Sequence, residues 1–130
     1  MPSARPPWRT LLVADHDVLA DVLVRALTGD ARFDPVASVQ DSSTAPAAAR
    51  RHRPDIVVFE TARPTPPVLA AAADVRSAAP EACLVLLSTD EPCAGVPGME
   101  VVDVVVTKDT ADIVDTLAGR VSACSGPAPA

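Results

Sequence analysis

The sequence predicts an α/β fold with a doubly wound, five-stranded parallel sheet in the strand order 2-1-3-4-5. Three observations lead to this prediction. Short apolar runs alternate with amphipathic stretches of helical length along the chain. The apolar runs lack polar alternation, as expected for strands that helices cover on both faces. Five strand–helix units of this length, joined by right-handed crossovers, favour the doubly wound arrangement.

Five apolar runs supply the predicted strands. The first run, residues 9–14, ends at Asp15. The second contains Pro35, which suits the edge of a sheet because proline cannot donate a hydrogen bond to a neighbouring strand. The later strands are predicted at 35–39, 55–59, 82–87 and 102–107.

Amphipathic or capped segments follow these strands and predict the helices. The first helix, residues 15–28, has an apolar stripe that should face the sheet. Ser42 or Ser43 can cap a short helix that reaches about Arg51. A third helix is predicted at 67–79, because proline is tolerated in a first helical turn. A final helix, capped by Asp109, should extend to about Ser122. The inward-facing residues are expected to be Leu19, Val22, Leu23, Ala26 and Leu27 in the first helix, and Ile113, Val114, Leu117 and Val121 in the last.

The segment 89–100 breaks the alternation of strands and helices. It contains two prolines and two glycines, at Pro92, Gly95, Pro97 and Gly98. In a helix interior a proline costs about 3 kcal/mol and a glycine about 1 kcal/mol. We therefore expect the fourth helix to be shortened to one turn or lost.

The length of 130 residues predicts one domain. The first seven residues include three prolines, and the last residues are rich in Pro, Ala and Gly. We expect a disordered segment at 1–8, a folded domain at 9–122, and a tail or the start of a linker to an output domain at 123–130.

The composition argues against several classes of protein. The net charge of −6 and the aromatic content of 2% disfavour direct binding to nucleic acid or to a membrane. No apolar run approaches the roughly 18 residues of a membrane span, and the start of the chain has no apolar signal-peptide core.

The three cysteines, Cys83, Cys93 and Cys124, form no CxxC pair. Their odd number suits a reducing cytoplasm better than a disulfide framework. We expect Cys83 to be a small, buried apolar side chain. The spacing of the cysteines and the two histidines predicts no metal site, and no cofactor is expected.

Charged residues follow three of the predicted strands at their carboxyl ends. Asp15 follows the first strand, Glu60 the third and Lys108 the fifth. Open parallel sheets place their binding sites in the crevice outside these strand ends. We therefore expect the three side chains to converge in one crevice.

Four stretches in register with these elements resemble the receiver domains of two-component response regulators, which have the CheY-like (flavodoxin-like) fold. They are Val13-Ala14-Asp15-His16, residues 55–60, Leu86-Leu87-Ser88-Thr89 and Val106-Thr107-Lys108-Asp109. Pro64 matches a proline four residues after the phosphoacceptor of that family. The spacing is most similar to the NarL/FixJ (LuxR-type) subfamily. The resemblance covers 9–122 and depends on the register, since no single stretch is specific.

In that family an acidic pair after strand one holds Mg²⁺, an Asp after strand three accepts a phosphoryl group, and a Ser or Thr and a Lys contact the phosphate. The resemblance therefore places Asp15, Glu60, Ser88 and Lys108 in a degenerate phosphorylation pocket. It is degenerate because Ala14 replaces one of the paired acids and Glu60 replaces the phosphoacceptor. Val105 also replaces a switch aromatic.

These departures predict that residue 60 is not phosphorylated. Mg²⁺ requires nearly octahedral oxygen ligands, so the loss of one carboxylate weakens its site. The extra methylene of Glu60 moves the acid forward by about 1.5 Å. Small misplacements of a phosphoryl acceptor can cost about 100-fold in rate. Glu60 is instead expected to pair with Lys108.

The resemblance implies a regulatory receiver domain that is not an enzyme. It would act in the cytoplasm by protein–protein contact, as a homodimer, to control an attached or separate helix-turn-helix output domain. An alternative is a small-molecule sensor that binds an effector in the vacated crevice. Residual phosphotransfer through Asp15 and Glu60 is a third hypothesis.

Simpler interpretations of the same residues stay open. Lys108 could be an ordinary surface lysine, Asp15 a helix cap and Ser88 a partner of the loop backbone. Asp17 could replace the missing acid. His16 is expected to be solvated, as is the basic cluster 50–53 at a helix end.

Overall fold

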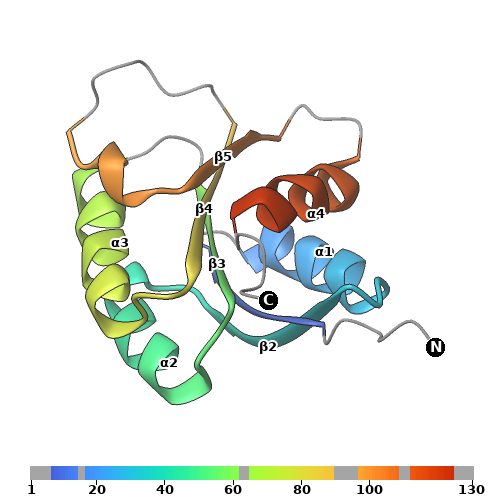
Figure 1. Cartoon of the computed structure of the whole chain (residues 1–130), viewed down its shortest axis with the longest axis horizontal. Helices are drawn as coiled ribbons and strands as arrows, with labels where there is room; N and C mark the ends of the chain where they lie inside the picture. Colours follow the sequence, from blue (N-terminus) through green and yellow to red (C-terminus); the bar gives the residue numbers. More distant parts are fainter. Residues whose placement is uncertain (1–6, 15–16, 62–64, 90–96, 109–111, 125–130) are drawn as a thin grey trace.

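The computed structural model describes residues 7–14, 17–61, 65–89, 97–108 and 112–124, and Figure 1 shows the arrangement of its elements. Five strands alternate with four α-helices and two short 3₁₀ turns. In chain order they are β1 Trp8–Ala14, α1 Asp17–Thr28, β2 Phe33–Val39, η1 Ser42–Thr44, α2 Ala45–His52, β3 Ile56–Thr61, α3 Pro66–Ala78, β4 Cys83–Ser88, η2 Met99–Val101, β5 Val104–Thr107 and α4 Ile113–Cys124.

The strands form one parallel sheet in the order β2-β1-β3-β4-β5, which confirms the predicted topology. The helices cover both faces: α2 and α3 lie on one, and α1 and α4 on the other (Figure 1). Alternate residues of each central strand therefore enter different cores. Leu12 and Val58 pack toward α1 and α4, whereas Leu11 and Val57 pack toward α2 and α3. Every residue of β3 and β4 is buried, as the apolar runs predicted.

The domain begins one residue earlier than predicted. Trp8, assigned above to a disordered segment, is the first residue of β1 and is only 9% exposed. Its ring packs against that of Phe33, with the ring centroids 5.3 Å apart, and its backbone N–H donates to the carbonyl of Arg32 at 2.9 Å. An aromatic pair of this kind buries a large apolar area, which explains why the strand extends to residue 8.

The edge strand β2 carries the predicted proline and an irregularity beside it. Thr10 lies opposite Pro35, but Leu11 lies opposite Ala37, so β2 has one extra residue at this point. Proline has no N–H to contribute to a ladder, and it is tolerated at a bulge in an edge strand for that reason.

The stripe predicted for α1 is partly wrong. Leu23 and Leu27 are buried, but Val22 is 60% exposed and Ala26 is also exposed. Val24, absent from the predicted stripe, packs partly against the core. Both patterns have helical spacing, so periodicity alone could not choose the buried face. The side chain of Leu19 lies outside the described residues.

Two helix starts differ from their predictions. Asp41, rather than Ser42 or Ser43, caps the first turn: its Oδ1 accepts hydrogen bonds from the N–H of Ser43 at 2.9 Å and from its hydroxyl at 2.8 Å. The last helix begins at Ile113, and Asp112 accepts a hydrogen bond from the N–H of Asp115 at 3.0 Å. Asp109, the predicted cap, lies outside the described residues.

The connection from β4 to β5 shows the predicted reduction of the fourth helix. Its described part, residues 89 and 97–103, contains only the 3₁₀ turn η2. Gly98 precedes this turn with φ of 92°, a left-handed conformation that glycine adopts without strain. A Cβ at this position would lie 3.2 Å from the Cβ of Leu69. Residues 90–96 of the connection, including Pro92 and Gly95, lie outside the described residues. None of the described helices is long and apolar enough to cross a bilayer.

The expectation for Cys83 is also corrected. Its side chain is buried, at 3% exposure, but it forms a disulfide with Cys124, the last residue of α4. The last helix also continues two residues beyond the predicted end of the domain, from Ser122 to Cys124. The prediction considered pairs close in sequence, whereas these cysteines are 41 positions apart. Cys93 lies outside the described residues.

An ion-pair cluster links the loop before β2 to α4. It predicts a lowered carboxyl pKa that a titration can measure. Arg32 donates to Asp30 at 2.6 Å and to Asp115 at 3.1 Å. Its side-chain hydrogen bond is the main cause that lowers the pKa of Asp30 to about 2. A lowered carboxyl pKa stabilises the fold above the ordinary value of 3.8, and this stabilisation is lost as the pH falls from about 4 to 2. A carboxyl-detected NMR titration should find the low pKa of Asp30, and Arg32→Ala should return it toward 3.8. An unchanged pKa in that variant would contradict the assignment.

Candidate functional site

The carboxyl ends of β1, β3, β4 and β5 bring the predicted site positions side by side. Ala14 lies opposite Glu60 on the neighbouring strand, and the next residue of β3, Thr61, lies opposite Ser88. Ser88 in turn lies opposite Thr107, the last residue of β5, so that Lys108 follows at the same edge. In Figure 1 this edge is the upper end of the sheet.

Glu60 and Lys108 form an ion pair between Oε1 and Nζ. The Glu60 side chain is 2% exposed and that of Lys108 is 17% exposed. A buried carboxylate is strongly disfavoured without a counter-charge, and water competes little for a pair this deep. The pair therefore joins the end of β3 to the end of β5, across the end of β4 that separates them in the sheet.

The second carboxylate oxygen of Glu60, Oε2, is buried and receives no hydrogen bond from the described part of the chain. Asp15 and His16, which follow Ala14, lie outside the described residues. The predicted approach of Asp15 to the other two charges therefore stays a prediction. Ala14 itself is 1% exposed and offers only a methyl group beside Glu60.

The backbone carbonyl of Ser88 fixes the position of the Lys108 backbone. The carbonyl of Ser88 accepts a hydrogen bond from the N–H of Lys108 at 2.9 Å, which continues the β4–β5 ladder by one residue. Ser88 is fully buried, at 0% exposure. This contact fixes where the lysine side chain starts, and the side chain then reaches over β4 to the carboxylate. A role of the Ser88 hydroxyl in contacting a phosphate stays a prediction.

Glu60 and Lys108 form a charge pair at the strand ends where the resemblance places a phosphoacceptor and a lysine. The strand register places Ala14 opposite Glu60, and the resemblance expects one of two metal-binding acids at the position of Ala14.

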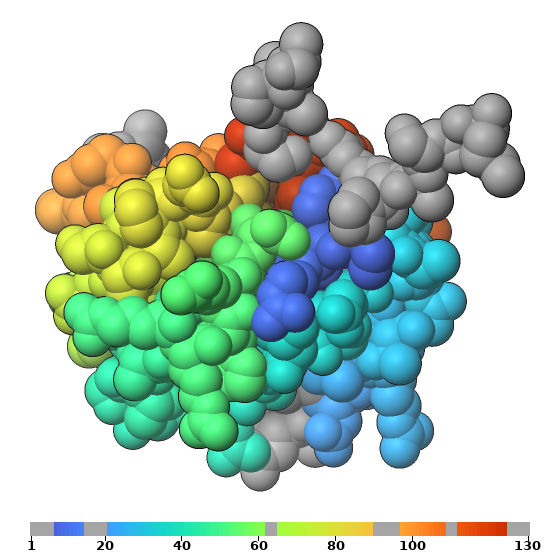
Figure 2. All heavy atoms as spheres, turned by 60° about the horizontal axis from the view of Figure 1, so that its bottom comes forward, coloured from blue at the N-terminus to red at the C-terminus, as the bar shows by residue number. Residues whose placement is uncertain are grey.

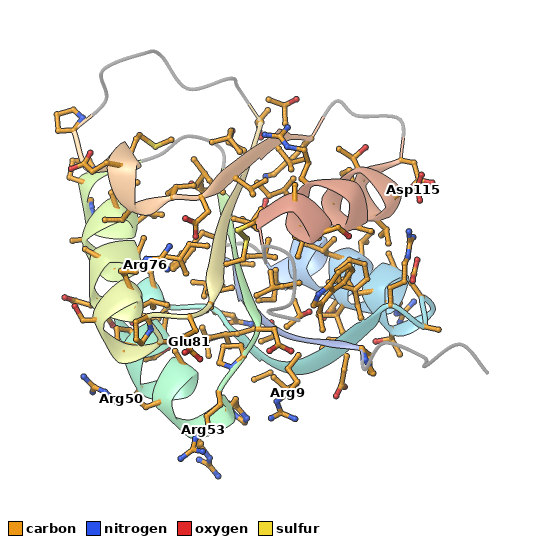
Figure 3. All side chains as sticks on the ribbon, viewed as in Figure 1. Arg9, Arg50, Arg53, Arg76, Glu81 and Asp115 are labelled. Carbon is orange, nitrogen blue, oxygen red and sulfur yellow. A yellow bond between two sulfur atoms is a disulfide. The ribbon has the colours of Figure 1, made fainter. Side chains whose placement is uncertain are left out.

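A second polar cluster, which the sequence interpretation missed, lies where β4 and β5 begin, at the opposite end of these strands from Glu60 and Lys108. Asp103 Oδ2 accepts hydrogen bonds from the Arg76 guanidinium and from the N–H of Leu84, the latter at 2.9 Å. Arg76 also donates to the carbonyls of Pro80, Ala82 and Val101 at 3.0 to 3.2 Å. Figure 3 shows Arg76 pointing from α3 toward the sheet. One arginine thereby ties α3, β4 and the start of β5 together.

Asp103 also lies beside the disulfide. The sulfurs of Cys83 and Cys124 and a carboxylate oxygen of Asp103 all lie within 4.8 Å of one another, and among the described residues they form a possible metal-ligating group. The sulfurs are bonded to each other, and the carboxylate is held by Arg76. No local sequence signal identified this group, because its members belong to segments far apart in the sequence.

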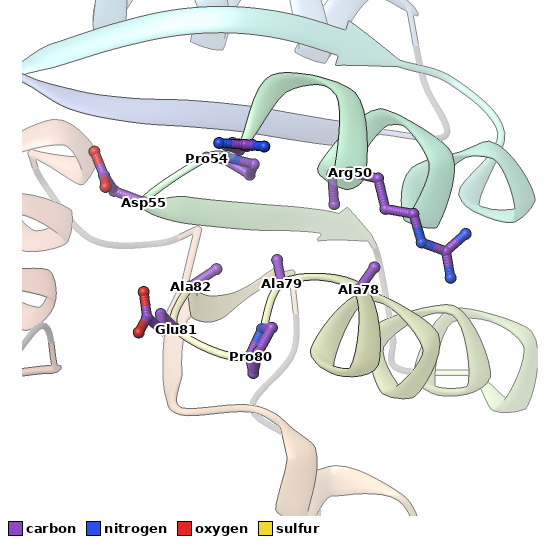
Figure 4. A pocket seen from close by; sticks show the side chains of 10 residues that line it. Arg50, Pro54, Asp55, Ala78, Ala79, Pro80, Glu81 and Ala82 are labelled. Atoms are coloured by element: carbon purple, nitrogen blue, oxygen red, sulfur yellow. The ribbon is translucent and has the colours of Figure 1, made fainter.

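The described pockets lie away from the Glu60–Lys108 pair. A pocket of about 450 Å³ lies at the opposite end of the sheet, where the parallel strands begin, between the segments 49–55 and 78–82 (Figure 4). Figure 2 shows α2 and the connection between α3 and β4 meeting on this face. Arg50 and Arg53 belong to the basic cluster 50–53, and with Arg9 they point outward there, in line with the expectation of a solvated helix end (Figure 3). A pocket of about 350 Å³ lies beside α4 and β5.

The sequence was compared with protein families and with known proteins. No protein-family profile matches the sequence. A protein-glutamate methylesterase/protein-glutamine glutaminase of Azospirillum brasilense is 34% identical over 83 residues, which are 64% of this chain. The chain spans about a fifth of the length of that relative, since the match covers 21% of it.

Solved structures of response regulators superimpose on almost the whole chain. A LuxR-family two-component response regulator from Aurantimonas sp. aligns with a TM-score of 0.76 and 23% identity, over 89% of this chain and 86% of that one. The receiver domain of the putative response regulator NarL from Mycobacterium tuberculosis gives 0.73 and 21%, over 92% and 99%. The response regulator domain of Thermotoga maritima CheB gives 0.75 and 16%, over 95% and 99%. The chain therefore has the fold of response regulator receiver domains.

Proposed function

We propose that this chain is a regulatory receiver-like domain whose state is set without phosphorylation and which acts through protein–protein contact. The observation that carries the proposal is the buried ion pair between Glu60 and Lys108 at the carboxyl ends of β3 and β5. In a receiver fold this edge is where the phosphoacceptor would lie. Here a permanent carboxylate already holds the lysine that would otherwise respond to a phosphoryl group.

The environment of Glu60 supports the loss of phosphotransfer. Transfer of a phosphoryl group requires an acceptor aligned with the donor and a metal that neutralises the phosphate charge. Glu60 is one methylene longer than aspartate, is almost completely buried and is already paired. Ala14 provides no carboxylate for a metal. We therefore interpret Asp15, Glu60, Ser88 and Lys108 as a degenerate phosphorylation pocket.

The partner proposed for the domain is a helix-turn-helix output module, attached or separate. Structures similar in fold include a DNA-binding LuxR-family regulator from Staphylococcus aureus and RcsB from Salmonella enterica bound to the promoter rprA. The net charge of −6 disfavours contact between this domain and DNA. Any effect on transcription would then pass through the output module, with a homodimer of this domain setting its geometry.

Incubation with a small phosphodonor and Mg²⁺ tests the central claim. Intact-mass measurement should show no adduct of about 80 Da, the mass of one phosphoryl group, on the wild-type protein. Glu60→Asp should also stay unmodified, because Ala14 still leaves the metal site short of a carboxylate. Ala14→Asp combined with Glu60→Asp supplies both missing groups and serves as the comparison variant. A wild-type adduct that Glu60→Gln abolishes would contradict the proposal.

Homodimerisation is tested separately by multi-angle light scattering over a range of concentrations. We expect a mass near twice 13.4 kDa at the highest concentrations. Because the Glu60–Lys108 charge pair is permanent, phosphodonor and Mg²⁺ should leave the association unchanged. A monomer at all accessible concentrations would contradict the dimer while leaving the absence of phosphorylation intact.

The effector-binding alternative gains no support from the described pockets. The pocket of about 450 Å³ lies at the opposite edge of the sheet from Glu60, and the one of about 350 Å³ lies beside α4. The ion pair also occupies the part of the crevice that a ligand would have to enter.

A further inference from the structure

We propose that Cys83 and Cys124 form a reversible redox site, at which a hydroperoxide joins the two thiols into the disulfide and thereby fixes the last turn of α4. This inference goes beyond the proposed function because it supplies an input that does not depend on phosphate. It rests on where the two sulfurs lie, on the different access to each, and on the weak helix that the bond secures.

The two cysteines belong to elements that differ in burial. Cys83 begins β4, a strand with every residue buried between two neighbouring strands. Cys124 is the last residue of α4, and the Cα atoms of the pair are 6.2 Å apart. That separation is within the range in which a disulfide forms without moving the backbone. The bond therefore ties the end of a helix to a strand in the middle of the molecule.

The last turn of α4 has few apolar core contacts apart from this bond. Leu117, Ala118 and Val121 are the buried residues of the helix, Ile113 and Val114 pack partly against the core, and among the described residues 122–124 the apolar core includes only Cys124. Gly119 lies in the helix interior, and a Cβ there would meet nothing within 4 Å, so packing does not require a glycine. Glycine lowers helix propensity, so the last turn should fray when its anchor is released.

Access to the two sulfurs differs, and this difference assigns their roles. Cys124 is half-buried and lines the pocket of about 350 Å³ together with Asp103, Val104, Arg120 and Ala123. Cys83 is 3% exposed and does not line that pocket. A small oxidant can thus reach Cys124 first.

The reaction balances with a hydroperoxide as oxidant. The Cys124 thiolate attacks the terminal oxygen, the O–O bond breaks, and an alcohol or water leaves with the proton, which gives a sulfenic acid on Cys124. The Cys83 thiol then attacks this sulfur, the S–O bond breaks, water leaves and the disulfide forms. Two electrons pass from the two sulfurs to the peroxide. A dithiol returns the pair to thiols by exchange and is itself oxidised to a disulfide.

The assignment of roles predicts an asymmetry between single variants. In a Cys93→Ser background, which leaves only the pair, Cys83→Ser should accumulate a sulfenic acid on Cys124 that dimedone traps on exposure to hydrogen peroxide. Cys124→Ser should react at least 10-fold more slowly, because Cys83 is buried. The protein with both cysteines should instead lose two hydrogens and give no dimedone adduct. Equal trapping of the two single variants would overturn the assignment.

Amide hydrogen exchange tests the consequence for α4. Reduction of the folded protein by millimolar dithiothreitol should speed exchange at residues 121–124, and peroxide should reverse it, while exchange in β3 stays unchanged. Gly119→Ala, which strengthens the same helix, should reduce the difference between the two redox states.

Three outcomes would overturn the proposal. The disulfide could resist dithiothreitol until the protein is denatured, which would make it a permanent crosslink. Exchange in α4 could be the same in both states. The reduced pair could retain Zn²⁺ through dialysis and resist peroxide, which would make Cys83, Asp103 and Cys124 a metal site. None of these results depends on whether Glu60 can be phosphorylated.

Discussion

Lys108→Met is expected to lower the free energy of unfolding by about 3 kcal/mol, because it leaves a buried carboxylate without a counter-charge. Glu60 is 2% exposed and its Oε2 receives no hydrogen bond in the described part of the chain, so its charge cannot reach water without distorting β3. For a domain of this size the melting temperature should fall by roughly 10 °C. Urea unfolding, followed by circular dichroism, gives the change in free energy.

Two comparison variants separate the loss of the ion pair from the loss of lysine packing. Glu60→Gln should cost less than Lys108→Met, since the Lys108 ammonium is partly accessible and can turn toward solvent. Glu60→Met combined with Lys108→Met removes both charges and should recover most of the stability, because an apolar pair of similar volume often replaces a buried ion pair without loss. If the double variant is as unstable as the sum of the single ones, Glu60 and Lys108 are not coupled.

Reduction of the Cys83–Cys124 disulfide is expected to lower the free energy of unfolding by about 4 kcal/mol. The crosslink closes a loop with a sequence separation of 41, and in the chain-entropy account its main effect is to restrict the unfolded state. That is a large share of the roughly 5–15 kcal/mol that stabilises an ordinary domain. Differential scanning calorimetry of the Cys93→Ser protein, with and without dithiothreitol, should show melting temperatures roughly 10–15 °C apart.

A matched variant shows whether this difference comes from the bond. In Cys83→Ala combined with Cys124→Ala, dithiothreitol should leave the melting temperature unchanged, and that temperature should lie near or below the one of the reduced protein. A melting temperature of the Cys93→Ser protein that does not respond to reductant would contradict the stabilising role of the disulfide. Intact mass before each scan establishes which redox state was melted.

Most of the fold was predictable from local patterns. Buried parallel strands are continuous apolar runs, and five such runs separated by helical segments leave few topologies to consider. The β4–β5 connection was predictable in the same way, since proline and glycine in the segment 89–100 act against a helix through their own backbones.

Features that depend on choices between similar local options were not predictable. Asp41 and Ser42 are both good helix caps, and only the path of the chain after β2 favours Asp41. Val22 and Val24 both fit an apolar stripe at helical spacing, and the rotation of α1 against the sheet buries Val24 in place of Val22. Trp8 follows a proline-rich start, and its place in β1 depends on Phe33 in the neighbouring strand.

The sequence by itself determined the class of fold, the order of its strands and the charged residues at three strand ends, because each follows from the apolar pattern or from the residue next to a strand. The pairing of Glu60 with Lys108 was expected from the sequence, and the structure contains it. The tertiary structure alone decided that Cys83 and Cys124 bond rather than remain separate thiols. The two cysteines are 41 positions apart, and their contact depends on how far the last helix runs back along the sheet, which no local pattern encodes.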